Sequence, residues 1–599
     1  MCGISGIYNC LNKKVNSIKI IEKIIKLQEK RGPDGKGLWQ SACDKVVLGH
    51  NRLSIIDLSD KAKQPFVSKD NNLTITFNGE IYNYKEIRSK LLQKNITFRS
   101  NSDTEVILEA YKFWGIEFLS KLRGMFSFAL WDNSKKKLIL ARDPFGIKPL
   151  YYLKNNGVFY FASQIKSLKS INDINFEFSN AGLVSYYLWG NIQEPFTLYK
   201  NIKSLTKGTC LIIDKDNNEE IINYANINDL ILNTEEIKFN DKNDQSNYLK
   251  DIIEETVNYH HVSDVPRTLL LSAGVDSNVI LSSMSKESKK NCSALTLDFD
   301  YKKKENETTL AKESAQINGI QHSVKGISNN EFAELIENFY KDMDSPTNDG
   351  FNNYLISYLA KKNNSKIIIS GIGGDELFFG YPSFNLIPKI NKNIKYLPKS
   401  NFVNSFFKKN IYSFLKKNKF KTKYSGLIEY GREINTGFLL TRSLFLPFEI
   451  EELISKKDFK EGYEELNFIN NSYNEIKEIK DTRLAIMYLE IKYYLCSKLL
   501  RDSDWVSMSH SIELRTPFVD WFFFKKMIPL IKSDKNFNKS TVINSFKNNL
   551  PKNLDKRKKT GFSIPHNEYL KKLSRNKQYA NPIRDWSILS YEKYLNYEQ

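Results

Sequence analysis

The sequence changes in texture near its middle, and this change limits which folds the chain can adopt. Residues 1 to about 165 consist of short runs rich in β-branched and aromatic residues, which are separated by tight turns of Gly, Pro, Asp and Asn. This pattern predicts antiparallel sheets packed against each other, with few helices outside them. Helical patterns interrupt the runs at Ile18–Lys30, Tyr84–Lys94 and Thr104–Trp114. The amino-terminal part is therefore expected to be an α+β domain.

A polar segment divides the chain. Residues 201–246 are rich in Asn, Asp, Lys and Glu, and we expect a linker that begins with a hairpin of Thr209–Asp214 and Glu220–Tyr224. After this segment, helical patterns alternate with hydrophobic runs at Thr268–Leu271, Ser293–Leu297 and Lys366–Ser370. The alternation predicts a parallel sheet with helices on both faces. The sequence thus predicts two domains, residues 1–200 and 247–599.

The composition limits the class of protein. Of the 599 residues, 41% are hydrophobic, which is enough for large buried cores and excludes a wholly disordered chain. The six cysteines include no C-x-x-C pair, so neither a zinc ribbon nor a dense disulfide framework is expected. The N-terminus has no signal-peptide pattern, and no apolar run approaches the ~18 residues that span a bilayer. We expect a cytoplasmic protein.

The chain carries a formal net charge of +20, from 89 Lys and Arg against 69 Asp and Glu. Such an excess would attract nucleic acid, anionic lipid or anionic small molecules, and it does not choose among them. Between Lys389 and Lys423 there are eleven lysines, interleaved with aromatic residues, and no acidic residue. This stretch predicts either a lysine-rich helical surface or a contact with a membrane surface or nucleic acid.

The first candidate for chemistry is Cys2, which directly follows the initiator methionine. If Met1 is removed, Cys2 carries a thiol and a free α-amine, with unperturbed pKa values of about 8.5 and about 7.7 to 8.0. The amine then serves as a base for its own side chain, and the residue becomes a self-contained nucleophile. A cysteine at this position also suits an inert role, so the surrounding motifs decide.

Five motifs with turn and strand signals follow in the amino-terminal part, at Arg31–Asp34, Arg52–Asp57, Phe77–Asn83, Ser102–Glu105 and Ala141–Tyr152. Together with Cys2 they resemble the glutaminase domain of class II glutamine amidotransferases, over about the first 165 residues. The resemblance implies an α+β N-terminal-nucleophile fold, in which two stacked antiparallel sheets lie between helices in an αββα arrangement. It also implies that the Cys2 thiolate attacks the carboxamide of glutamine.

The resemblance assigns roles that match the chemistry of glutamine hydrolysis. The Asn78 amide and the Gly79 N–H would stabilise the oxyanion, and each such donor is worth about 10²–10³ in rate. Arg52 would bind the α-carboxylate of glutamine, and Glu80 and Asp103 its ammonium group. Singly, these residues also suit a turn, an N-cap and a surface ion pair. The complete glutamine-binding set is Arg52, Leu53, Ser54, Ile55, Ile56, Asn78, Gly79, Glu80 and Asp103.

A second motif, Leu269–Ser277, runs from a hydrophobic strand through a turn of small residues into a helix. Successive backbone N–H groups at a helix N-terminus bind anions, which predicts a phosphate chain as the ligand. The Walker A pattern is absent from the sequence, which argues against ordinary γ-phosphoryl transfer. The segment instead resembles the pyrophosphate loop of enzymes that split ATP into AMP and pyrophosphate, with Ala273 in place of the first glycine. That replacement is tolerated if the residue does not need a positive φ.

Further segments support a nucleotide site. Ser370–Phe378 follows a strand and carries adjacent carboxylates, which suit Mg²⁺ that bridges phosphate oxygens. We expect Asp276 and Asp375 to be the metal ligands. These segments resemble the asparagine synthetase family in order and spacing, as do Lys498–Met508, Glu513–Asp520 and Arg557–Pro565. The resemblance implies an α/β pyrophosphate-loop synthetase domain, with a parallel sheet and helices.

The family resemblance implies a reaction in two steps, with ATP and Mg²⁺. A carboxylate acceptor, expected to be aspartate, attacks ATP to give an acyl-adenylate and pyrophosphate, and ammonia from glutamine then displaces AMP to give an amide. Lys559 would stabilise charge on the reacting phosphate. Ammonia would pass from Cys2 to the adenylate through an internal passage. The expected ATP-binding residues are Leu271, Ser272, Gly274, Asp276, Ser277, Leu297, Ser370 and Gly371.

Two residues depart from the family pattern. Ile372 lies where asparagine synthetases commonly carry an acidic residue between two glycines, and an apolar side chain is neither a base nor a hydrogen-bond partner. Amidation of a carboxylate on a cell-envelope sugar or a peptidoglycan precursor therefore stays an alternative. Gln164 replaces a Glu near the end of the first domain, which would alter the contact between the domains.

The remaining alternatives concern partners. A nucleic-acid-binding pyrophosphate-loop tRNA modifier would explain the net charge, but the complete glutaminase set and the lack of paired cysteines argue against it. We therefore expect no nucleic-acid partner, and the same set disfavours a protein without catalytic activity. The family resemblance leaves a homodimer open. The stretch from Lys389 to Lys423 leaves open a weak association with a membrane surface.

Overall fold

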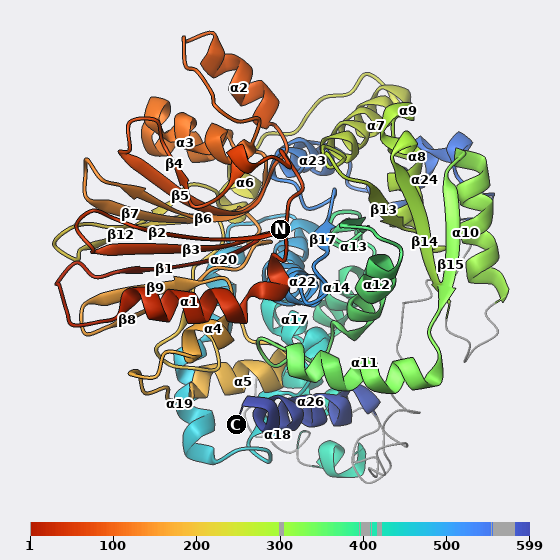
Figure 1. Ribbon diagram of the computed structural model, residues 1–599. Coiled ribbons are helices and arrows are strands. Elements are labelled where there is room, and N and C mark those ends of the chain that lie inside the picture. Colours follow the sequence, from red (N-terminus) through yellow and green to blue (C-terminus); the bar gives the residue numbers. More distant parts are fainter. Residues whose placement is uncertain are drawn as a thin grey trace.

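The chain forms two assemblies that lie side by side, one built on two stacked antiparallel sheets and the other on a parallel sheet (Figure 1). We call them the amino-terminal and the carboxyl-terminal assembly. Helices cover the outer faces of the sheets and fill the lower part of the molecule in this view. The structure is a computed structural model, and it describes residues 2–298, 305–394, 396, 408, 410–415, 422–552, 554 and 581–598.

Six strands form the first antiparallel sheet, in the order β10-β8-β9-β1-β3-β2. Within it, β1 pairs with β3 on one side and with β9 on the other. Because β1 begins at Gly3, this pairing fixes Cys2 at the end of a central strand. The strands are β1 (Gly3–Tyr8), β2 (Gly35–Gln40), β3 (Val46–Arg52), β8 (Tyr151–Asn155), β9 (Val158–Ala162) and β10 (Lys203–Ser204).

The second antiparallel sheet also has six strands, in the order β12-β11-β7-β6-β5-β4. Its strand β5 pairs with β6 along its whole length, with Asn78 opposite Ser127 and Gly79 opposite Phe126. The Asn-Gly pair therefore lies within a strand, not in a turn. The strands are β4 (Phe66–Val67), β5 (Leu73–Ile81), β6 (Gly124–Asp132), β7 (Lys137–Arg142), β11 (Thr209–Ile213) and β12 (Glu219–Asn223).

Large apolar side chains fill the space between these two sheets, among them Ile4, Tyr8, Trp131, Leu140, Phe159 and Phe161. Outside them, α1 (Ser17–Leu27) packs on β1 and β3, and α3 (Asp103–Trp114) packs on β5 beside α2 (Tyr84–Leu92). This arrangement confirms the predicted αββα fold. The three predicted helices are present, with ends that differ by a few residues because caps, not periodicity, set them.

The predicted linker, residues 201–246, is partly wrong. Its hairpin forms, but β11 pairs with β7 from Cys210–Ala141 to Ile213–Leu138 and extends the second sheet. Strand β10 likewise joins the first sheet. Residues up to Asn223 therefore belong to the amino-terminal assembly. The prediction missed this because the segment is polar on average, although β11 is a buried run. Only α6 (Ile227–Asn233) and a short irregular stretch then precede α7 (Lys242–Tyr259).

The carboxyl-terminal assembly contains the predicted parallel sheet, in the order β15-β14-β13-β16-β17. All four strand pairs are parallel, which confirms the expectation from the alternating pattern. Because β13 and β16 are neighbours, the loops after their carboxyl ends meet at one edge, where ligands of such sheets bind. The strands are β13 (Arg267–Leu270), β14 (Cys292–Asp298), β15 (Gln321–Gly326), β16 (Ile367–Ile369) and β17 (Glu513–Arg515).

One long helical run, residues 482–508, crosses the centre of the molecule beside the amino-terminal assembly (Figure 1). It consists of α21 (Thr482–Leu489), a π-helix (Glu490–Leu500) and α22 (Arg501–Met508). π-Helical turns are rare in proteins, and those that occur are often at functional sites. The side chains on this run are therefore candidates for a functional site.

The other helices cover the parallel sheet or form the lower part of the molecule (Figure 1). In the amino-terminal assembly they are α4 (Ile165–Lys169) and α5 (Asn180–Trp189). In the carboxyl-terminal assembly they are α8 (Val275–Ser283), α9 (Lys286–Lys290), α10 (Glu305–Asn318), α11 (Asn329–Asp342), α12 (Phe351–Lys362), α13 (Gly374–Leu377), α14 (Ser383–Ile394), α16 (Leu427–Tyr430), α17 (Ile434–Arg442), α18 (Pro447–Ile450), α19 (Lys456–Leu466), α20 (Phe468–Ile476), α23 (Trp521–Ser533), α24 (Lys539–Ser545) and α26 (Pro582–Glu598).

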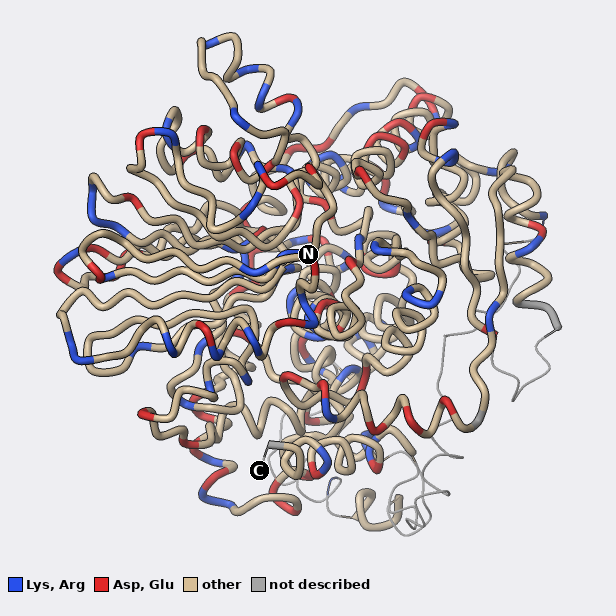
Figure 2. The backbone as a smooth tube through the Cα atoms, in the orientation of Figure 1, with Lys and Arg blue, Asp and Glu red and all other residues tan. Residues whose placement is uncertain are grey.

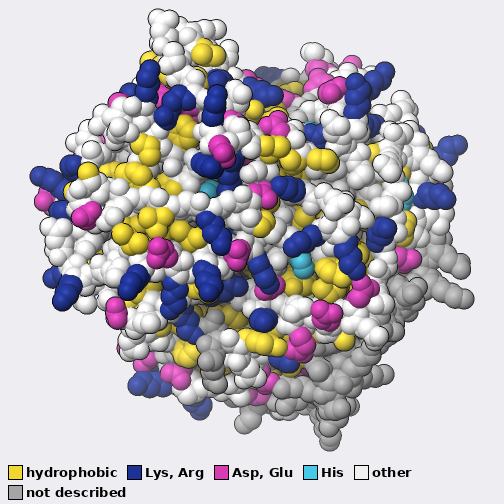
Figure 3. Space-filling view, viewed as in Figure 1, with side chains coloured by type: hydrophobic (Ala, Val, Ile, Leu, Met, Phe, Trp, Pro, Cys, Tyr) yellow, Lys and Arg dark blue, Asp and Glu magenta, His cyan; other side chains and the backbone are white. Residues whose placement is uncertain are grey.

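Charged side chains are spread over the molecule. Figure 2 shows basic and acidic residues interspersed along both assemblies, and Figure 3 shows the same mixture on one face. Most of the stretch from Lys389 to Lys423 lies outside the described residues, so its predicted partners stay a prediction. Among the helices that the structure describes, none has the length and apolar character needed to cross a membrane.

Candidate active site

Cys2 lies at the end of β1 and is held through its main chain. Its N–H donates a hydrogen bond of 2.9 Å to Asn78 Oδ1, and its carbonyl oxygen accepts one of 3.1 Å from Arg31 Nε. The side chain is buried, and burial raises the pKa of the Cys2 thiol, although the Leu53 N–H and Arg52 oppose this effect. A nearby base must therefore take the proton before the sulfur can attack.

Asn78 and Gly79 are placed to donate hydrogen bonds beside Cys2. Asn78 is fully buried, and its Nδ2 has no hydrogen-bond partner among the described residues, which is costly unless a ligand accepts from it. Gly79 has φ of +153°, and a Cβ there would lie 2.1 Å from the carbonyl oxygen of Met125. Only glycine fits this position, and Gly79 lines the same cavity as Cys2.

A narrow cavity of about 30 Å³ opens at this point, and we call it the Cys2 cavity. It collects most of the glutamine-binding residues predicted from the sequence. Two predicted residues, Ser54 and Asn78, are not among the lining residues. The Ser54 N–H instead donates to Asp34 Oδ2, and Asn78 adjoins the cavity through its hydrogen bond with the Cys2 N–H. The lining residues are Cys2, Arg52, Leu53, Ile55, Ile56, Ala62, Gln64, Phe77, Gly79, Glu80, Ser102, Asp103 and Thr104.

Gln64 is a lining residue that the sequence analysis missed. Its Nε2 donates to Thr104 Oγ1 at 3.1 Å, and its Oε1 accepts from the Phe77 N–H at 2.7 Å. Gln64 thus ties the wall of the Cys2 cavity to the start of α3. No local motif marks this residue, because its partners come from distant parts of the chain.

The charges of the Cys2 cavity suit an amino acid. Arg52 is held by the carbonyl oxygens of Ser59 and Asp57. Burial raises the pKa of Asp103 to about 7 and also raises the pKa of Glu80, which lies near Glu513. A ligand ammonium would restore the ionised form of both carboxyl groups. The cavity therefore offers a cation for a carboxylate and two acidic groups for an ammonium.

The loop between β13 and α8 is closed by its own side chains. Ser277 Oγ donates to the carbonyl oxygens of Ser272 and Gly274, and Asn278 Nδ2 donates to the same two oxygens. Ala273 is not among the described residues with a positive φ. The replacement of the family's first glycine is therefore tolerated, as expected. The N–H groups at the start of α8 stay available for an anion.

Asp276 and Asp375 come together from the loops after β13 and β16. A Cβ on Gly374 would lie 2.5 Å from Asp276 Cγ, so glycine permits this approach. Lys539 Nζ lies between the carboxylates, 2.8 Å from Asp276 Oδ2 and 2.5 Å from Asp375 Oδ1. Asp276 and Asp375 are both largely buried, and paired carboxylates are the donors that Mg²⁺ uses together with phosphate oxygens. The structure thus brings the two predicted ligands together, and it adds Lys539, which lies between them and which the sequence analysis missed.

The other predicted nucleotide-binding residues at this edge of the sheet make fewer contacts that bear on their roles. Ser370 and Gly371 begin the loop that carries Asp375, and a Cβ on Gly371 would lie 2.9 Å from Asp276 Cβ. Leu271 donates its N–H to Leu295 O, beside Leu297 on β14. Lys559 lies outside the described residues, so its predicted role stays a prediction.

A cluster of polar side chains lies next to Asp375 and extends to the long helical run. Burial and then Asp375 raise the pKa of Glu376 to about 8, and Tyr381 donates a hydrogen bond of 3.0 Å to Glu376 Oε1. Arg442 packs against the rings of Tyr381 and Tyr494, 4.1 Å from each centroid, and the two rings meet edge to face at 85°. Its Nη2 pairs with the fully buried Glu490 at 2.9 Å. Sequence reasoning noted Glu376 within Ser370–Phe378 but missed Tyr381, Arg442 and Glu490, because separate segments supply them. Ile372 is partly buried against the core of the same assembly.

Buried polar contacts connect the assemblies. Arg31 Nη1 lies 2.9 Å from Asp504 Oδ2 on α22, and Lys148 approaches the other oxygen of Asp504 at 3.5 Å. After Gln164, the N–H groups of Ile165 and Lys166 donate to the carboxylate of Asp344. Gln164 therefore lies next to the contact between the assemblies, as expected from its departure. The Cys2 cavity and the Asp276 edge belong to one packed unit.

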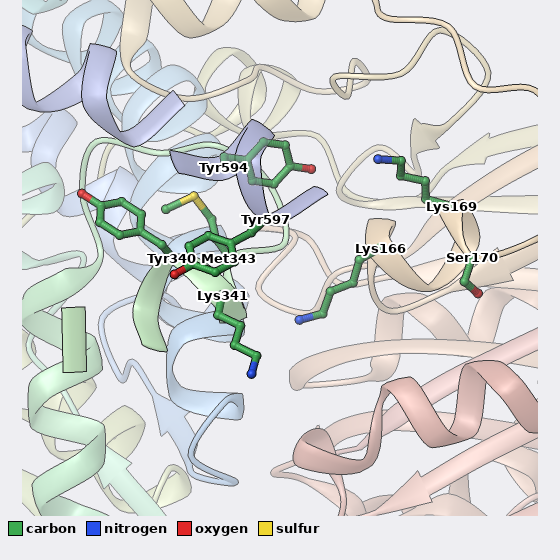
Figure 4. A pocket seen from close by; sticks show the side chains of 8 residues that line it. All are labelled: Lys166, Lys169, Ser170, Tyr340, Lys341, Met343, Tyr594 and Tyr597. Carbon is green, nitrogen blue, oxygen red and sulfur yellow. The ribbon is translucent and has the colours of Figure 1, made fainter. Parts of the chain in front are cut away.

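A separate cavity of about 270 Å³ lies where α4, α11 and α26 meet (Figure 4). In Figure 4, Lys166 extends from α4 toward the side of the cavity that carries Lys341 and Tyr597. None of the lining residues belongs to either predicted site, so this cavity lies outside both. They are Lys166, Lys169, Ser170, Tyr340, Lys341, Met343, Tyr594 and Tyr597.

Comparison with known proteins agrees with this arrangement. Residues 1–225 match the family model of the glutamine amidotransferase domain, and residues 248–597 match that of asparagine synthase. Asparagine synthetase (glutamine-hydrolyzing) 1 of Bacillus subtilis (strain 168) is 31% identical over 95% of this chain and 88% of its own length. Asparagine synthetase (glutamine-hydrolyzing) 3 of the same organism is 26% identical over 96% of this chain and 89% of its own length. A solved structure, the allosteric regulatory enzyme of purine biosynthesis, covers 54% of this chain and 80% of its own at 15% identity, with a TM-score of 0.30.

An N-terminal-nucleophile amidotransferase fold joined to a parallel-sheet synthetase domain defines a glutamine-hydrolysing ligase. Both family models match in chain order, and together they cover nearly all of the residues. The chain belongs to the asparagine synthase family.

Proposed function

We propose that this enzyme converts aspartate to asparagine with ATP and with ammonia from glutamine, and releases AMP and pyrophosphate. ATP-dependent amidation that consumes glutamine is the reaction of its family. The observation that carries the proposal is the packing of the Cys2 cavity and the Asp276–Asp375 pair into one unit, through the buried contact of Arg31 with Asp504.

In the first half-reaction, the Cys2 sulfur attacks the carboxamide carbon of glutamine after its proton moves to the α-amine of the same residue. Asn78 Nδ2 and the Gly79 N–H donate hydrogen bonds to the oxyanion. Arg52 holds the α-carboxylate, and Glu80 and Asp103 hold the ammonium group. Collapse of the intermediate releases ammonia and leaves a thioester, which water hydrolyses to glutamate.

In the second half-reaction, a carboxylate oxygen of the acceptor attacks the α-phosphorus of ATP, and pyrophosphate leaves. Ser272, Gly274 and Ser277 hold the phosphates at the start of α8. Asp276 and Asp375 would hold Mg²⁺, which would neutralise phosphate charge when bound. Lys559 would stabilise the charge that develops on the reacting phosphate. Ammonia then attacks the acyl carbon, the bond to AMP breaks, and the amide forms with loss of one proton.

A second acceptor class is favoured by Ile372 and the polar cluster around Arg442. An apolar side chain at position 372 provides no hydrogen bond to a small acceptor, whereas Arg442, which packs against two tyrosine rings, suits a carboxylate on a larger ring-shaped molecule. A uronic acid of a cell-envelope sugar, or a peptidoglycan precursor, is the alternative acceptor. A homodimer, a cytoplasmic location and a weak association with membrane surfaces stay further proposals.

The test is one incubation of the purified protein with Mg²⁺, ATP, aspartate and glutamine labelled with ¹⁵N in the amide. Mass spectrometry should find labelled asparagine in amounts equal to AMP. Cys2→Ala should abolish glutamine use and retain product formation from ammonium salts. If glutamine is hydrolysed but aspartate gives no AMP, the acceptor is wrong, and a panel of uronic acids follows. If neither glutamine nor ATP is consumed, the proposed function is wrong.

A further inference from the structure

Arg515 contacts both candidate sites through two different groups. Its side chain is fully buried at the end of β17, where Nη2 lies 3.5 Å from Glu80 Oε2, a lining residue of the Cys2 cavity. Its carbonyl oxygen accepts a hydrogen bond of 2.9 Å from the N–H of Ser370, the first residue of the loop that carries Asp375. One residue therefore joins the Cys2 cavity to the nucleotide edge of the parallel sheet.

The other contacts of the guanidinium fix its plane. Nε donates to Glu513 Oε1 at 2.6 Å, and Nη1 donates to the carbonyl oxygens of His260 at 2.9 Å and Val262 at 2.6 Å. A lysine cannot reproduce this fork, because it offers one point charge. Nη2 and Glu80 Oε2 have no hydrogen-bond partner among the described residues. The contact with Glu80 is thus the loosest of the set.

Glu80 is the less well compensated of two buried carboxylates at this point. Glu80 and Glu513 are both buried beside the Arg515 guanidinium. Burial, and then Glu513, raise the pKa of Glu80, whereas Arg515, the amino terminus and Lys148 together outweigh burial and lower the pKa of Glu513. Buried carboxylates are costly without a matching cation. A second cation beside Glu80 would complete the balance.

We propose that Arg515 is a positioning residue that couples the occupancy of the two sites. The inference rests on the proposed function, which places the ammonium of glutamine beside Glu80. That ammonium competes with Arg515 for the same carboxylate, so the guanidinium shifts toward Glu513. The end of β17 moves with it and changes the position of Ser370. Because binding coupling is reciprocal, glutamine changes the affinity for ATP by the factor by which ATP changes the affinity for glutamine.

The test uses the full chain with Cys2→Ala, which binds glutamine without hydrolysing it. Calorimetry measures the Kd of ATP with Mg²⁺, with and without saturating glutamine, and the Kd of glutamine with and without ATP. We expect each Kd to change at least threefold, by equal factors. Addition of Glu513→Gln and Arg515→Met removes the guanidinium and neutralises the carboxylate that would lose its partner. The change should then fall below 1.5-fold, while both ligands still bind.

The matched control is Arg123→Met with Asp520→Asn. Arg123 Nε pairs with Asp520 at 2.8 Å across the same two assemblies, both side chains are buried, and neither lines the Cys2 cavity. This control should keep at least a threefold change. If the first double variant does not fold, Arg515→Lys replaces it, and the change should fall by at least half.

A kinetic measurement separates positioning from mere support of the fold. With Cys2 present, Arg515→Lys should raise the KM for glutamine about tenfold and leave kcat for glutamine hydrolysis within twofold. A loss of folded protein would lower kcat instead. The inference is overturned if both ligands bind to the Cys2→Ala protein without mutual effect. It is also overturned if the effect survives loss of the guanidinium. If neither ligand binds, the proposed function fails first, and the coupling fails with it.

Discussion

Arg31 donates a hydrogen bond of 3.1 Å from Nε to the carbonyl oxygen of Cys2. The same guanidinium pairs with Asp504 on α22, so the main chain of the candidate nucleophile is anchored from the other assembly. The position of Cys2 therefore depends on a residue more than 500 positions later in the chain. This dependence is the basis of the first prediction.

Asp504→Asn should destabilise the protein and lower glutamine hydrolysis together. Both side chains of the pair are almost fully buried, and breaking such a pair costs about 3–5 kcal/mol. Urea unfolding measures the loss. The control is Asp34→Asn, which breaks the exposed pair of Asp34 with Lys366 between the same assemblies and should cost under ~1 kcal/mol. Equal losses in the two variants would contradict the prediction.

Asn78→Ala should lower kcat for glutamine hydrolysis by about 10²–10³, because one oxyanion donor is lost. Product formation from ammonium salts should stay within twofold, since Asn78 contacts Cys2 and has no part in the proposed nucleotide site. Steady-state assays with each nitrogen source measure both rates. Asn72→Ala, at an exposed position just before β5, is the control. A parallel fall with ammonium would show that Asn78 acts through the fold instead.

The efficiency of glutamine hydrolysis should rise with pH near neutrality. The pKa of Asp103 is raised to about 7 by burial, so below this pH the group is neutral and attracts the ammonium of glutamine weakly. As the pH rises through 7, the carboxylate forms and kcat/KM should rise with it, because kcat/KM reports the free enzyme. Asp103→Asn should lose this rise and keep the separate one due to the Cys2 amine. An unchanged profile in the variant would exclude Asp103 as its source.

Lys539→Met should make the stability depend on Mg²⁺. Without the ammonium, the carboxylates of Asp276 and Asp375 face each other, and a divalent cation relieves their repulsion. We expect the melting temperature of the metal-free variant to fall by roughly 2 °C or more and to recover with Mg²⁺. Thermal melts with EDTA and with Mg²⁺ measure this difference. Lys535→Met, an exposed neighbour, should show no such recovery.

Most of the fold could be predicted from local sequence patterns. Alternating apolar residues and turn signals marked the strands, and small residues after Leu271 marked the loop before α8. The predicted domain boundary was wrong at β11, because five buried residues between polar neighbours do not change a segment's average composition. A periodic pattern predicts which face of a strand or helix is buried. It does not predict which edge of a distant sheet a strand will pair with.

The candidate sites were predictable only where motifs are contiguous. Arg52, Asn78 and Asp276 lie in such motifs, and the structure brings Arg52 and Asn78 to Cys2 and Asp276 to Asp375, while their roles stay predictions. Lys539 and Gln64 meet their partners through chain folding, without a local signal. Lys559 lies outside the described residues and stays a prediction.

The hairpin of β11 and β12 also determines where the chain can be truncated without exposing a buried strand. Strand β12 forms one edge of the second sheet, and its residues, among them Glu219 and Glu220, are mostly exposed. Charged edges of this kind discourage pairing with other chains. A fragment that stops at residue 200 would lose this edge and leave the buried strand β7 (Lys137–Arg142) as an open template for aggregation. An isolated amino-terminal fragment should therefore extend past Asn223 to remain monodisperse.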